Sequence, residues 1–328
     1  MKHFAFACLG VALLASCRKD DVIICGPPVP AIQPTPAAAF ADLRAASPAV
    51  QTFSFDLGQA QTLHTSGGAT LAFGAGAFLL PNGTVATGKA ELRVREIYTV
   101  ADMILANLPT STSSKQMLIS GGEFNIQVWQ GTNRLSMPIG LPPLLPQPQP
   151  QVQPRLTLIS PVPTAGLDTT QMMLWRRTSL VGAGTAADTS GWQFNGTPIF
   201  PTAGFYKAAL PLDSIANWNI DQFWHKYQTS PRTVVGVDVP AGGTGSTNVF
   251  FRPVGFNGLA RSYVYVPAPT HWECPLPVGA DMIAVVLQQR DGQLYFGTQR
   301  LTVQPNSTLT PTLQALTAAE IVQLVRKL

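Results

Sequence analysis

The chain has 328 residues, of which 45% are hydrophobic and 12% are charged, and its formal net charge is +4. The lysines and arginines are spread along the chain without a basic block, which excludes the electrostatic footprint of a nucleic-acid-binding protein. The hydrophobic fraction is sufficient for a buried core, and the 29 prolines and 28 glycines favour short strands joined by turns over long helices.

The N-terminal residues have the pattern of an export signal. Lys2 precedes an apolar run over residues 4–15, which at about 12 residues is too short to span a bilayer as a helix. The sequence Leu14-Ala15-Ser16-Cys17 then resembles the lipobox of bacterial lipoproteins. This resemblance implies that residues 1–16 are a signal peptide and that Cys17 is acylated, and the covalent lipid is the only cofactor we expect. The alternatives are an uncleaved anchor and a secretory signal cut at another position.

The residues after Cys17 narrow the expected location. Lys19, Asp20 and Asp21 resemble the export signal that sends Bacteroidota lipoproteins to the outer face of the outer membrane. The resemblance implies two kinds of partner, the outer membrane through the lipid and the lipoprotein processing and export machinery. The periplasmic leaflet of the outer membrane is the alternative location, because acidic residues near a solvated tether are common.

Residues 17–48 are predicted to form a lipidated, proline-rich tether with a short helix over 37–46. Two further cysteines follow Cys17, at Cys25 and Cys274. They either form a disulfide that links the tether to the distal domain or remain two separate thiols, because sequence spacing does not fix their geometry.

Residues 49–197 are predicted to form a first β-sandwich domain. Apolar and polar residues alternate over 53–57, 69–73, 90–95 and 119–129, and an Asn-Gly turn lies at 82–83. Short strands with frequent turns are typical of a sandwich. The proline-dense stretch 138–163 is either a linker or an excursion within this sandwich, and 174–177 with 191–194 should form a hairpin that closes the domain.

Part of this domain resembles a known fold family. Gly67-Gly68-x-x-Leu71, the turn at 74–78 and the strand 90–97 after Thr87-Gly88 are similar to segments of ZU5-type β-sandwiches. Residues 101–109 and 120–124 are also similar to segments of Bacteroidota lipoproteins. The resemblance implies a binding or scaffolding fold rather than an enzyme, and it assigns no functional residues.

Residues 198–328 are predicted to form a second sandwich, transthyretin-like or immunoglobulin-like. Strands are expected over 233–239, 248–253, 262–266, 282–289 and 293–303, with a hairpin turn at 290–293. A C-terminal helix should follow, because Thr317 and Glu320 form a capping box and Ile321, Leu324, Val325 and Leu328 share one helix face. The predicted fold class is therefore mainly β, with two β-sandwich domains and a short C-terminal helix.

The densest aromatic cluster, Trp218, Trp224 and Tyr227, has two interpretations. If the rings are exposed, they form a stacking platform for sugars. If they are buried, they are core residues at a domain junction. We favour the buried interpretation, because aromatic side chains are mostly buried.

Other chemistry-bearing residues are sparse. His271 and Glu273 would share a strand face, but a closed zinc site needs four ligands, so no metal is expected. Thr169 and Ser214 lie in Asp-Ser/Thr triplets that resemble Bacteroidota O-glycosylation sites, or they simply begin turns. The first domain also holds carboxylates that could support glycoside hydrolysis: Glu91, Glu96, Asp102 and Glu123.

The chain holds no zinc-protease motif, nucleophile elbow, phosphate loop or calcium loop. The sequence therefore predicts a non-enzymatic lipoprotein, anchored in the outer membrane and exposed at the surface, that binds a ligand or acts in envelope assembly. One alternative is a carbohydrate-binding lipoprotein of a nutrient-uptake system, so a glycan and an envelope protein are both expected partners. The other alternative is a hydrolase that uses carboxylates of the first domain.

Overall fold

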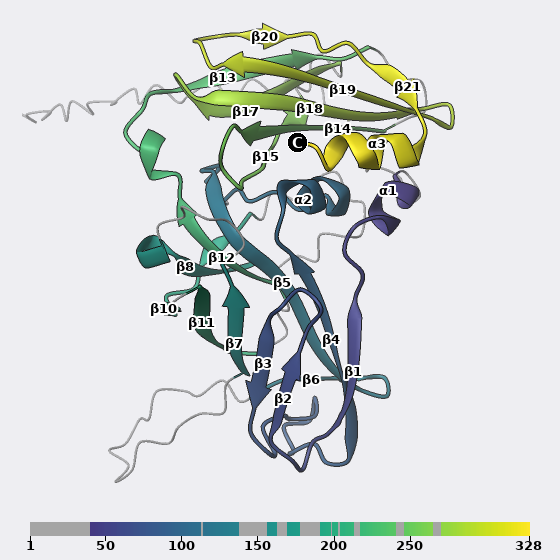
Figure 1. The fold of residues 1–328 in the computed structure, drawn as a ribbon, viewed down its shortest axis with the longest axis vertical. Coiled ribbons are helices and arrows are strands. Elements are labelled where there is room, and N and C mark those ends of the chain that lie inside the picture. The colour runs from purple at the N-terminus through teal and green to yellow at the C-terminus, as the bar shows by residue number, and fades with distance from the viewer. Residues whose placement is uncertain are drawn as a thin grey trace, which may run out of the picture. The chain divides into compact units, whose positions relative to one another are not determined.

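The computed structural model describes residues 40–112, 114–137, 156–162, 169–177, 191–197, 199–202, 204–212, 217–240, 246–264 and 270–328. These residues form a mainly β protein with short helices, as predicted (Figure 1). The expected signal peptide, acylated cysteine, export signal and tether cysteine all lie outside the described residues (Cys17, Lys19, Asp20, Asp21 and Cys25), as does Ser214.

The first sandwich packs a seven-stranded sheet against a five-stranded sheet. The larger sheet has the order β1 (Gln51–Asp56), β4 (Lys89–Ile97), β5 (Leu118–Gln130), β12 (Asn217–Phe223), β8 (Met173–Arg177) and β9 (Gln193–Phe194), with β6 (Asn133–Leu135) paired to β5. The smaller sheet has the order β10 (Ile199–Thr202), β11 (Phe205–Leu210), β7 (Leu156–Pro161), β3 (Thr70–Phe73) and β2 (Gln61–His64). A 3-10 turn, η1 (Thr169–Gln171), precedes β8.

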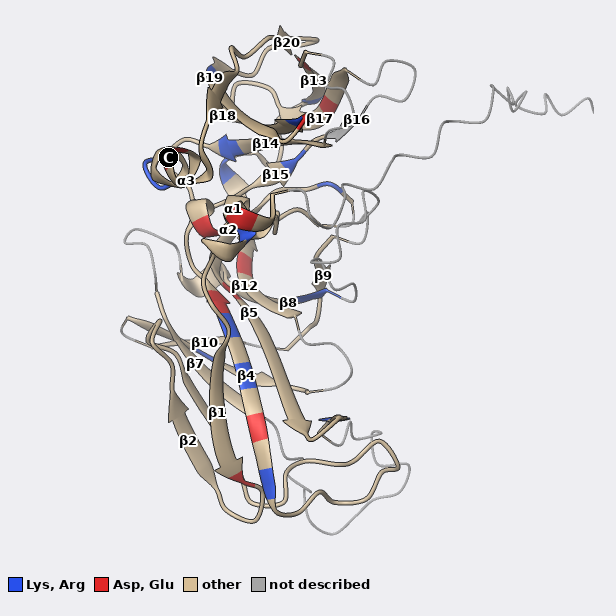
Figure 2. Cartoon of the chain, turned by 90° about the vertical axis from the view of Figure 1, so that its right-hand side faces the viewer, with Lys and Arg blue, Asp and Glu red and all other residues tan. Residues whose placement is uncertain are grey.

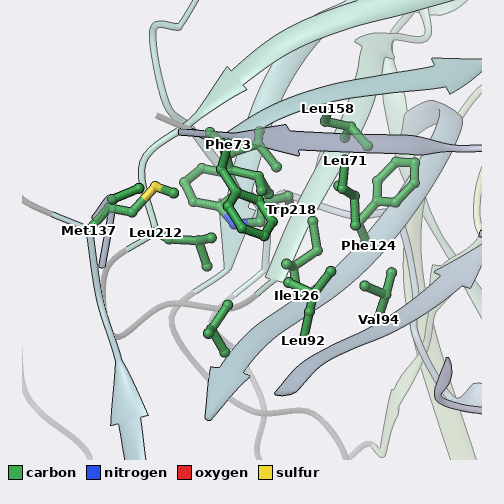
Figure 3. Packing of buried hydrophobic residues seen from close by; sticks show 14 of the residues in the cluster. Leu71, Phe73, Leu92, Val94, Phe124, Ile126, Met137, Leu158, Leu212 and Trp218 are labelled. Atoms are coloured by element: carbon green, nitrogen blue, oxygen red, sulfur yellow. The ribbon is translucent and has the colours of Figure 1, made fainter. Parts of the chain in front are cut away.

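Alternating side chains of both sheets fill the first core. Leu92, Phe124 and Trp218 from the larger sheet pack with Leu71 and Leu158 from the smaller one (Figure 3). All five are fully buried or nearly so, and the alternation that predicted these strands places their polar neighbours on the outer faces. Burial of this apolar surface is the main stabilising contribution to the sandwich.

The second sandwich packs a four-stranded sheet against a five-stranded one. The first has the order β16 (Tyr263–Val264), β17 (His271–Pro277), β13 (Arg232–Asp238) and β20 (Thr308–Leu309). The second has the order β15 (Ala260–Arg261), β14 (Ser246–Pro253), β18 (Asp281–Arg290), β19 (Gln293–Thr302) and β21 (Gln314–Leu316). A 3-10 turn, η2 (His225–Tyr227), lies between β12 and β13.

Three helices cover one face of the β14–β18–β19 sheet. They are α1 (Ala41–Ala45), α2 (Val100–Ala106) and α3 (Ala318–Val325). Leu43, Met103 and Ile321, one from each helix, share a buried cluster with Phe250 and Val285 of the sheet. The ends of the described chain therefore pack on the same sheet.

Several local predictions are confirmed. The hairpin turn between β18 and β19 has positive φ at Asp291 and Gly292, and the capping box of α3 joins Thr317 and Glu320 in both directions. The β8–β9 hairpin forms with Trp175 opposite Phe194. The stretch 138–163 contributes β7 to the middle of the five-stranded sheet, which supports an excursion within the first sandwich.

Two predicted boundaries are wrong. Strands β10, β11 and β12 belong to the first sandwich, so that sandwich extends past residue 197 to about residue 223. Long-range pairing with β7 and β5 decides this, and no local composition signal reports such pairing. The tether was expected to reach residue 48, but Phe40 and Leu43 are buried among the three helices, so the folded body includes α1.

Whether the first sandwich belongs with the ZU5-type folds and the second with transthyretin-like or immunoglobulin-like folds stays a prediction.

Candidate functional site

A bulge in β5 opens a buried polar site at the junction of the two sandwiches. Pairing of β5 with β12 shifts register between Asn219 and Asp221, opposite Gly121 and Gly122. A Cβ at Gly121 would lie 2.9 Å from Tyr206 and 3.0 Å from the carbonyl oxygen of Ile220. Gly122 has φ +140°, and a Cβ there would lie 2.9 Å from Tyr98. Only glycine fits both positions, which explains the Gly-Gly pair in the sequence.

Four polar side chains gather around the bulge, and we call them the junction cluster: Ser120, Glu123, Asn219 and Asp221. Each is buried, with at most 2% of its surface exposed. The Ser120 hydroxyl donates to Asn219 Oδ1 at 2.9 Å and accepts from the Gly122 N–H at 3.1 Å. Asn219 Nδ2 donates to Asp221 Oδ2. The bulge therefore brings polar side chains of two strands together in the buried interior.

The two carboxyl groups of the junction cluster favour the protonated form. Burial raises the pKa of Glu123 well above its ordinary value, although the charges of Arg177 and Arg95 oppose the shift. Burial, together with the nearby charge of Glu123, raises the pKa of Asp221. Among the described residues, neither oxygen of Glu123 has a hydrogen-bond partner. A buried carboxyl without donors avoids the cost of desolvating a charge by keeping its proton.

Glu96 on the neighbouring strand β4 is also buried, but hydrogen-bond donors surround its carboxylate. Its carboxylate accepts hydrogen bonds from Gln51 Nε2 at 2.8 Å, the Thr65 hydroxyl at 2.8 Å and the Tyr98 hydroxyl at 2.9 Å. The Gly67 N–H adds a further one at 3.2 Å. A Cβ at Gly67 would lie 2.7 Å from the Glu96 carboxylate, so the Gly67-Gly68 turn exists in part to enclose this group.

The second sandwich holds the junction cluster in place through the loop after β14. Asn257 Nδ2 donates to the carbonyl oxygens of Ser120, at 2.8 Å, and Tyr98, at 2.9 Å. The Ser120 N–H donates back to the Asn257 carbonyl oxygen at 2.7 Å. In the same region the Thr110 N–H donates to the Leu259 carbonyl oxygen at 2.8 Å, and the Leu259 N–H donates to the Thr110 hydroxyl oxygen at 2.9 Å. The cluster therefore belongs to both sandwiches.

A second polar feature runs along the outer face of the seven-stranded sheet. Trp129 Nε1 donates to Gln127 Oε1 at 3.0 Å, Gln127 Nε2 donates to Asn125 Oδ1 at 3.0 Å, and Asn125 Nδ2 donates to Asn217 Oδ1 at 2.6 Å. We call these four residues the amide ladder. All are half-buried, and the Arg93 guanidinium lies 5.5 Å from the centre of the Trp129 ring.

Charged residues of both signs line the adjacent strand β4 (Figure 2). Asn125 and Gln127 each use one N–H and one lone pair in these bonds, and a side-chain amide has two of each. The outer face of this sheet therefore offers hydrogen-bond donors and acceptors beside an indole ring. This combination suits a polar, hydroxyl-rich ligand.

The aromatic platform, the less favoured interpretation of Trp218, Trp224 and Tyr227, is not formed. Trp218 has 0% exposure in the first core, because it alternates inward on β12 (Figure 3), and Trp224 has 6% exposure in the second core. Tyr227 is half-buried against Trp224, with ring centres 4.5 Å apart. The favoured interpretation of these aromatics as core residues is the one that the structure supports. Trp218 shares one face of β12 with Ile220, and both side chains lie in the first core.

The candidate hydrolytic carboxylates and the candidate glycosylation residue Thr169 do not form a common site. Glu91 pairs with Arg93 at 2.9 Å, Asp102 accepts from Thr99 at the start of α2, and Glu96 and Glu123 lie on opposite faces of their sheet. The four carboxylates therefore do not face one another as a hydrolytic pair. Thr169 lies half-buried in η1.

The side chains around Cys274 point to alternate faces of strand β17. Cys274 is buried, and no disulfide joins it to another described residue; pairing with Cys25 stays a prediction. Burial raises the pKa of its thiol to about 12, which keeps the sulfur protonated. On the opposite strand face His271 Nδ1 lies 2.6 Å from Asp238 Oδ1 and its Nε2 lies 3.8 Å from Glu273 Oε1. No three His, Cys, Asp or Glu side chains in the described part of the chain are placed to hold a metal ion.

No protein-family model matches this chain, and no curated protein is significantly similar to it. None of the helices within the described ranges has the length and apolar character to cross a membrane. The junction cluster was not predicted from the sequence. Its one local signal was Ser120-Gly121-Gly122-Glu123, where two glycines interrupt an alternating strand beside a carboxylate that should have faced solvent.

Proposed function

We propose that this chain is a non-enzymatic binding protein, anchored to the outer membrane by lipid on Cys17 and displayed at the cell surface. The observation that carries the proposal is the Leu14-Ala15-Ser16-Cys17 lipobox followed by Lys19, Asp20 and Asp21, with folded structure from Phe40 onward. Two acyl chains hold a protein stably at a membrane, because each buried methylene contributes about 0.8 kcal/mol.

The body supports a binding role. Its buried carboxyls are either fully hydrogen-bonded, as Glu96 is, or enclosed and proton-bearing, as Glu123 is, and neither is presented to a substrate. The polar groups that reach the surface include those of the amide ladder on the seven-stranded sheet. A sheet that presents amides fits ligand recognition or envelope assembly better than catalysis.

Two variants test the lipid anchor and the surface-export signal. Cys17→Ser should abolish incorporation of labelled palmitate. Replacing Lys19, Asp20 and Asp21 with alanine should keep the lipid but protect a C-terminally tagged protein from proteinase K on intact cells, where the wild type is digested. Equal digestion of both would place the export information elsewhere, and equal protection would place the protein on the periplasmic leaflet.

The amide ladder favours carbohydrate capture as a second candidate function. Its indole and amides replace the rejected Trp218 and Trp224 platform, because they lie on an outer face rather than in a core. A glycan array with the wild type should show binding that Trp129→Ala and Gln127→Ala reduce together. Phe194→Ala, an exposed aromatic on β9 of the same sheet, is the matched control. Binding unaffected by both ladder substitutions would rule out this face.

A further inference from the structure

The outer face of the five-stranded sheet carries an exposed apolar patch. Phe200 on β10 is 59% exposed and Phe205 on β11 is 43% exposed. Tyr206, Ala208 and Leu210 of β11 alternate inward into the first core, so Phe205 and Lys207 point outward.

Strand register joins these residues into one surface. Phe200 lies opposite Lys207, and Lys207 lies opposite Ile159 on β7. Phe205 lies opposite Pro161 in the neighbouring row. Ile159 and Pro161 are themselves half-exposed. We call Phe200, Phe205, Lys207, Ile159 and Pro161 the aromatic patch.

The five-stranded sheet carries almost no charged residues. Its five strands contain no aspartate or glutamate, and Lys207 is their one lysine or arginine. Charged residues of both signs line β4 of the other sheet, whereas β2 and β7 are drawn without either colour in Figure 2. Aromatic rings around a lysine, with no carboxylate among these strands, complement an anionic, partly apolar surface.

We propose that the aromatic patch rests on the lipid bilayer, with Phe200 and Phe205 at the headgroup boundary and Lys207 beside anionic headgroups. This inference rests on the proposed lipid anchor, which keeps the patch close to the bilayer. Residues 18–39 reach at most roughly 75 Å when extended, so they impose an upper limit on the distance from the membrane but no minimum. A tethered surface needs only weak affinity, because the tether supplies a high effective concentration.

The test uses the mature chain from residue 17 with Cys17→Ser, so that binding to vesicles depends neither on acylation nor on the apolar residues 4–15. Co-sedimentation is measured with vesicles of phosphatidylcholine alone and of phosphatidylcholine with phosphatidylglycerol. Phe200→Ser with Phe205→Ser should weaken binding to both vesicles by roughly tenfold or more, since two phenyl rings lose their burial. Lys207→Gln should weaken binding roughly fivefold on the anionic vesicles and leave binding to the neutral ones unchanged.

The matched control is Phe194→Ser with Val234→Ser, which removes two exposed apolar side chains from other sheets and should leave vesicle binding unchanged. All patch residues replaced are at the surface, so thermal unfolding should confirm that the variants fold.

Equal binding of patch and control variants would overturn the proposal. So would a patch substitution that lowers the sedimentation coefficient of the Cys17→Ser protein, because the occupant would then be a second copy. Palmitate incorporation into the wild type tests the anchor separately, so the failure of one proposal is distinguishable from the failure of the other.

Discussion

At the scale of residues, two buried glutamates on neighbouring strands meet opposite surroundings. Glu96 accepts four hydrogen bonds, whereas Glu123 has no donor among the described residues and lies near Asp221. A buried carboxylate is stabilised by donors aimed at it, and a buried carboxyl without them stays neutral. The same residue type therefore has different consequences for stability at the two positions.

For Glu123 the consequence is a dependence of stability on pH. Because its pKa is raised in the folded state, the folded protein keeps a proton that the unfolded chain releases above its ordinary value near 4.3. The contribution to stability is complete below that value and is lost as pH rises through the folded pKa. Wild type and Glu123→Gln should therefore differ increasingly in favour of the variant as the pH of urea denaturation is raised. Glu91→Gln on the same sheet is the control, and parallel curves for wild type and Glu123→Gln would contradict the assignment.

Glu96→Gln should destabilise the fold. The new N–H₂ group would replace one carboxylate oxygen and face either the hydroxyls of Thr65 and Tyr98 or the N–H groups of Gln51 and Gly67, and all four donors would lose a charged acceptor. A lost hydrogen bond to a charged group costs about 1.5–3 kcal/mol of unfolding free energy. Urea denaturation at pH 7 measures this loss, and a loss below about 0.5 kcal/mol would show that the enclosure tolerates an amide.

At the scale of elements, the bulge in β5 depends on two glycines. Gly122→Ala should destabilise the fold by about 1–3 kcal/mol, because alanine at φ +140° is strained and its Cβ would press on the Tyr98 ring. Gly74→Ala is the control, since no atom lies within 4 Å of a Cβ at that position. Thermal unfolding compares the two variants. Equal effects would show that backbone strain at the bulge is small.

The C-terminal helix α3 shows how local and tertiary signals combine. Its capping box and apolar stripe were predictable, and the buried members of that stripe are Ile321 and Val325. Ile321→Ala should cost about 2–5 kcal/mol, since the side chain packs against α1 and the β14–β18–β19 sheet. Gln323→Ala on the exposed face should cost little. A small effect for Ile321→Ala in urea denaturation would mean that the helix contributes little to the fold.

These elements also mark where sequence reasoning stops. Alternation predicted β1, β3 and β4 because each strand buries one face, and the turn at Asp291-Gly292 follows from local φ preferences. The burial of Trp218 and Trp224 depends on contacts between distant strands, and the junction cluster depends on such contacts and on the bulge in β5. No local pattern encodes such contacts, so the aromatic platform stayed an alternative beside the favoured core interpretation, and the junction cluster was not predicted.

At the scale of the whole molecule, β5 joins the two sandwiches. Met117, just before the strand, and Ile119 enter the second core together with Trp224, whereas Phe124 and Ile126 lie in the first. The predicted boundary at residue 197 failed for the same reason, because chain order does not report that β12 returns to pair with β5. The sandwiches therefore share an element, and we expect them to unfold together.

Asn257→Ala tests this coupling. The substitution removes the hydrogen bonds from Asn257 Nδ2 to Ser120 and Tyr98 but leaves β5, Met117 and Ile119 in place. Two buried carbonyl oxygens lose a donor, so the free energy of unfolding should fall by about 1–3 kcal/mol. Calorimetry should still show a single transition at lower temperature, because the shared strand keeps both cores dependent on each other. Gln314→Ala, an exposed amide on β21, should leave the transition unchanged. Two resolved transitions in Asn257→Ala would show instead that the side chain of one asparagine is what makes the sandwiches cooperative.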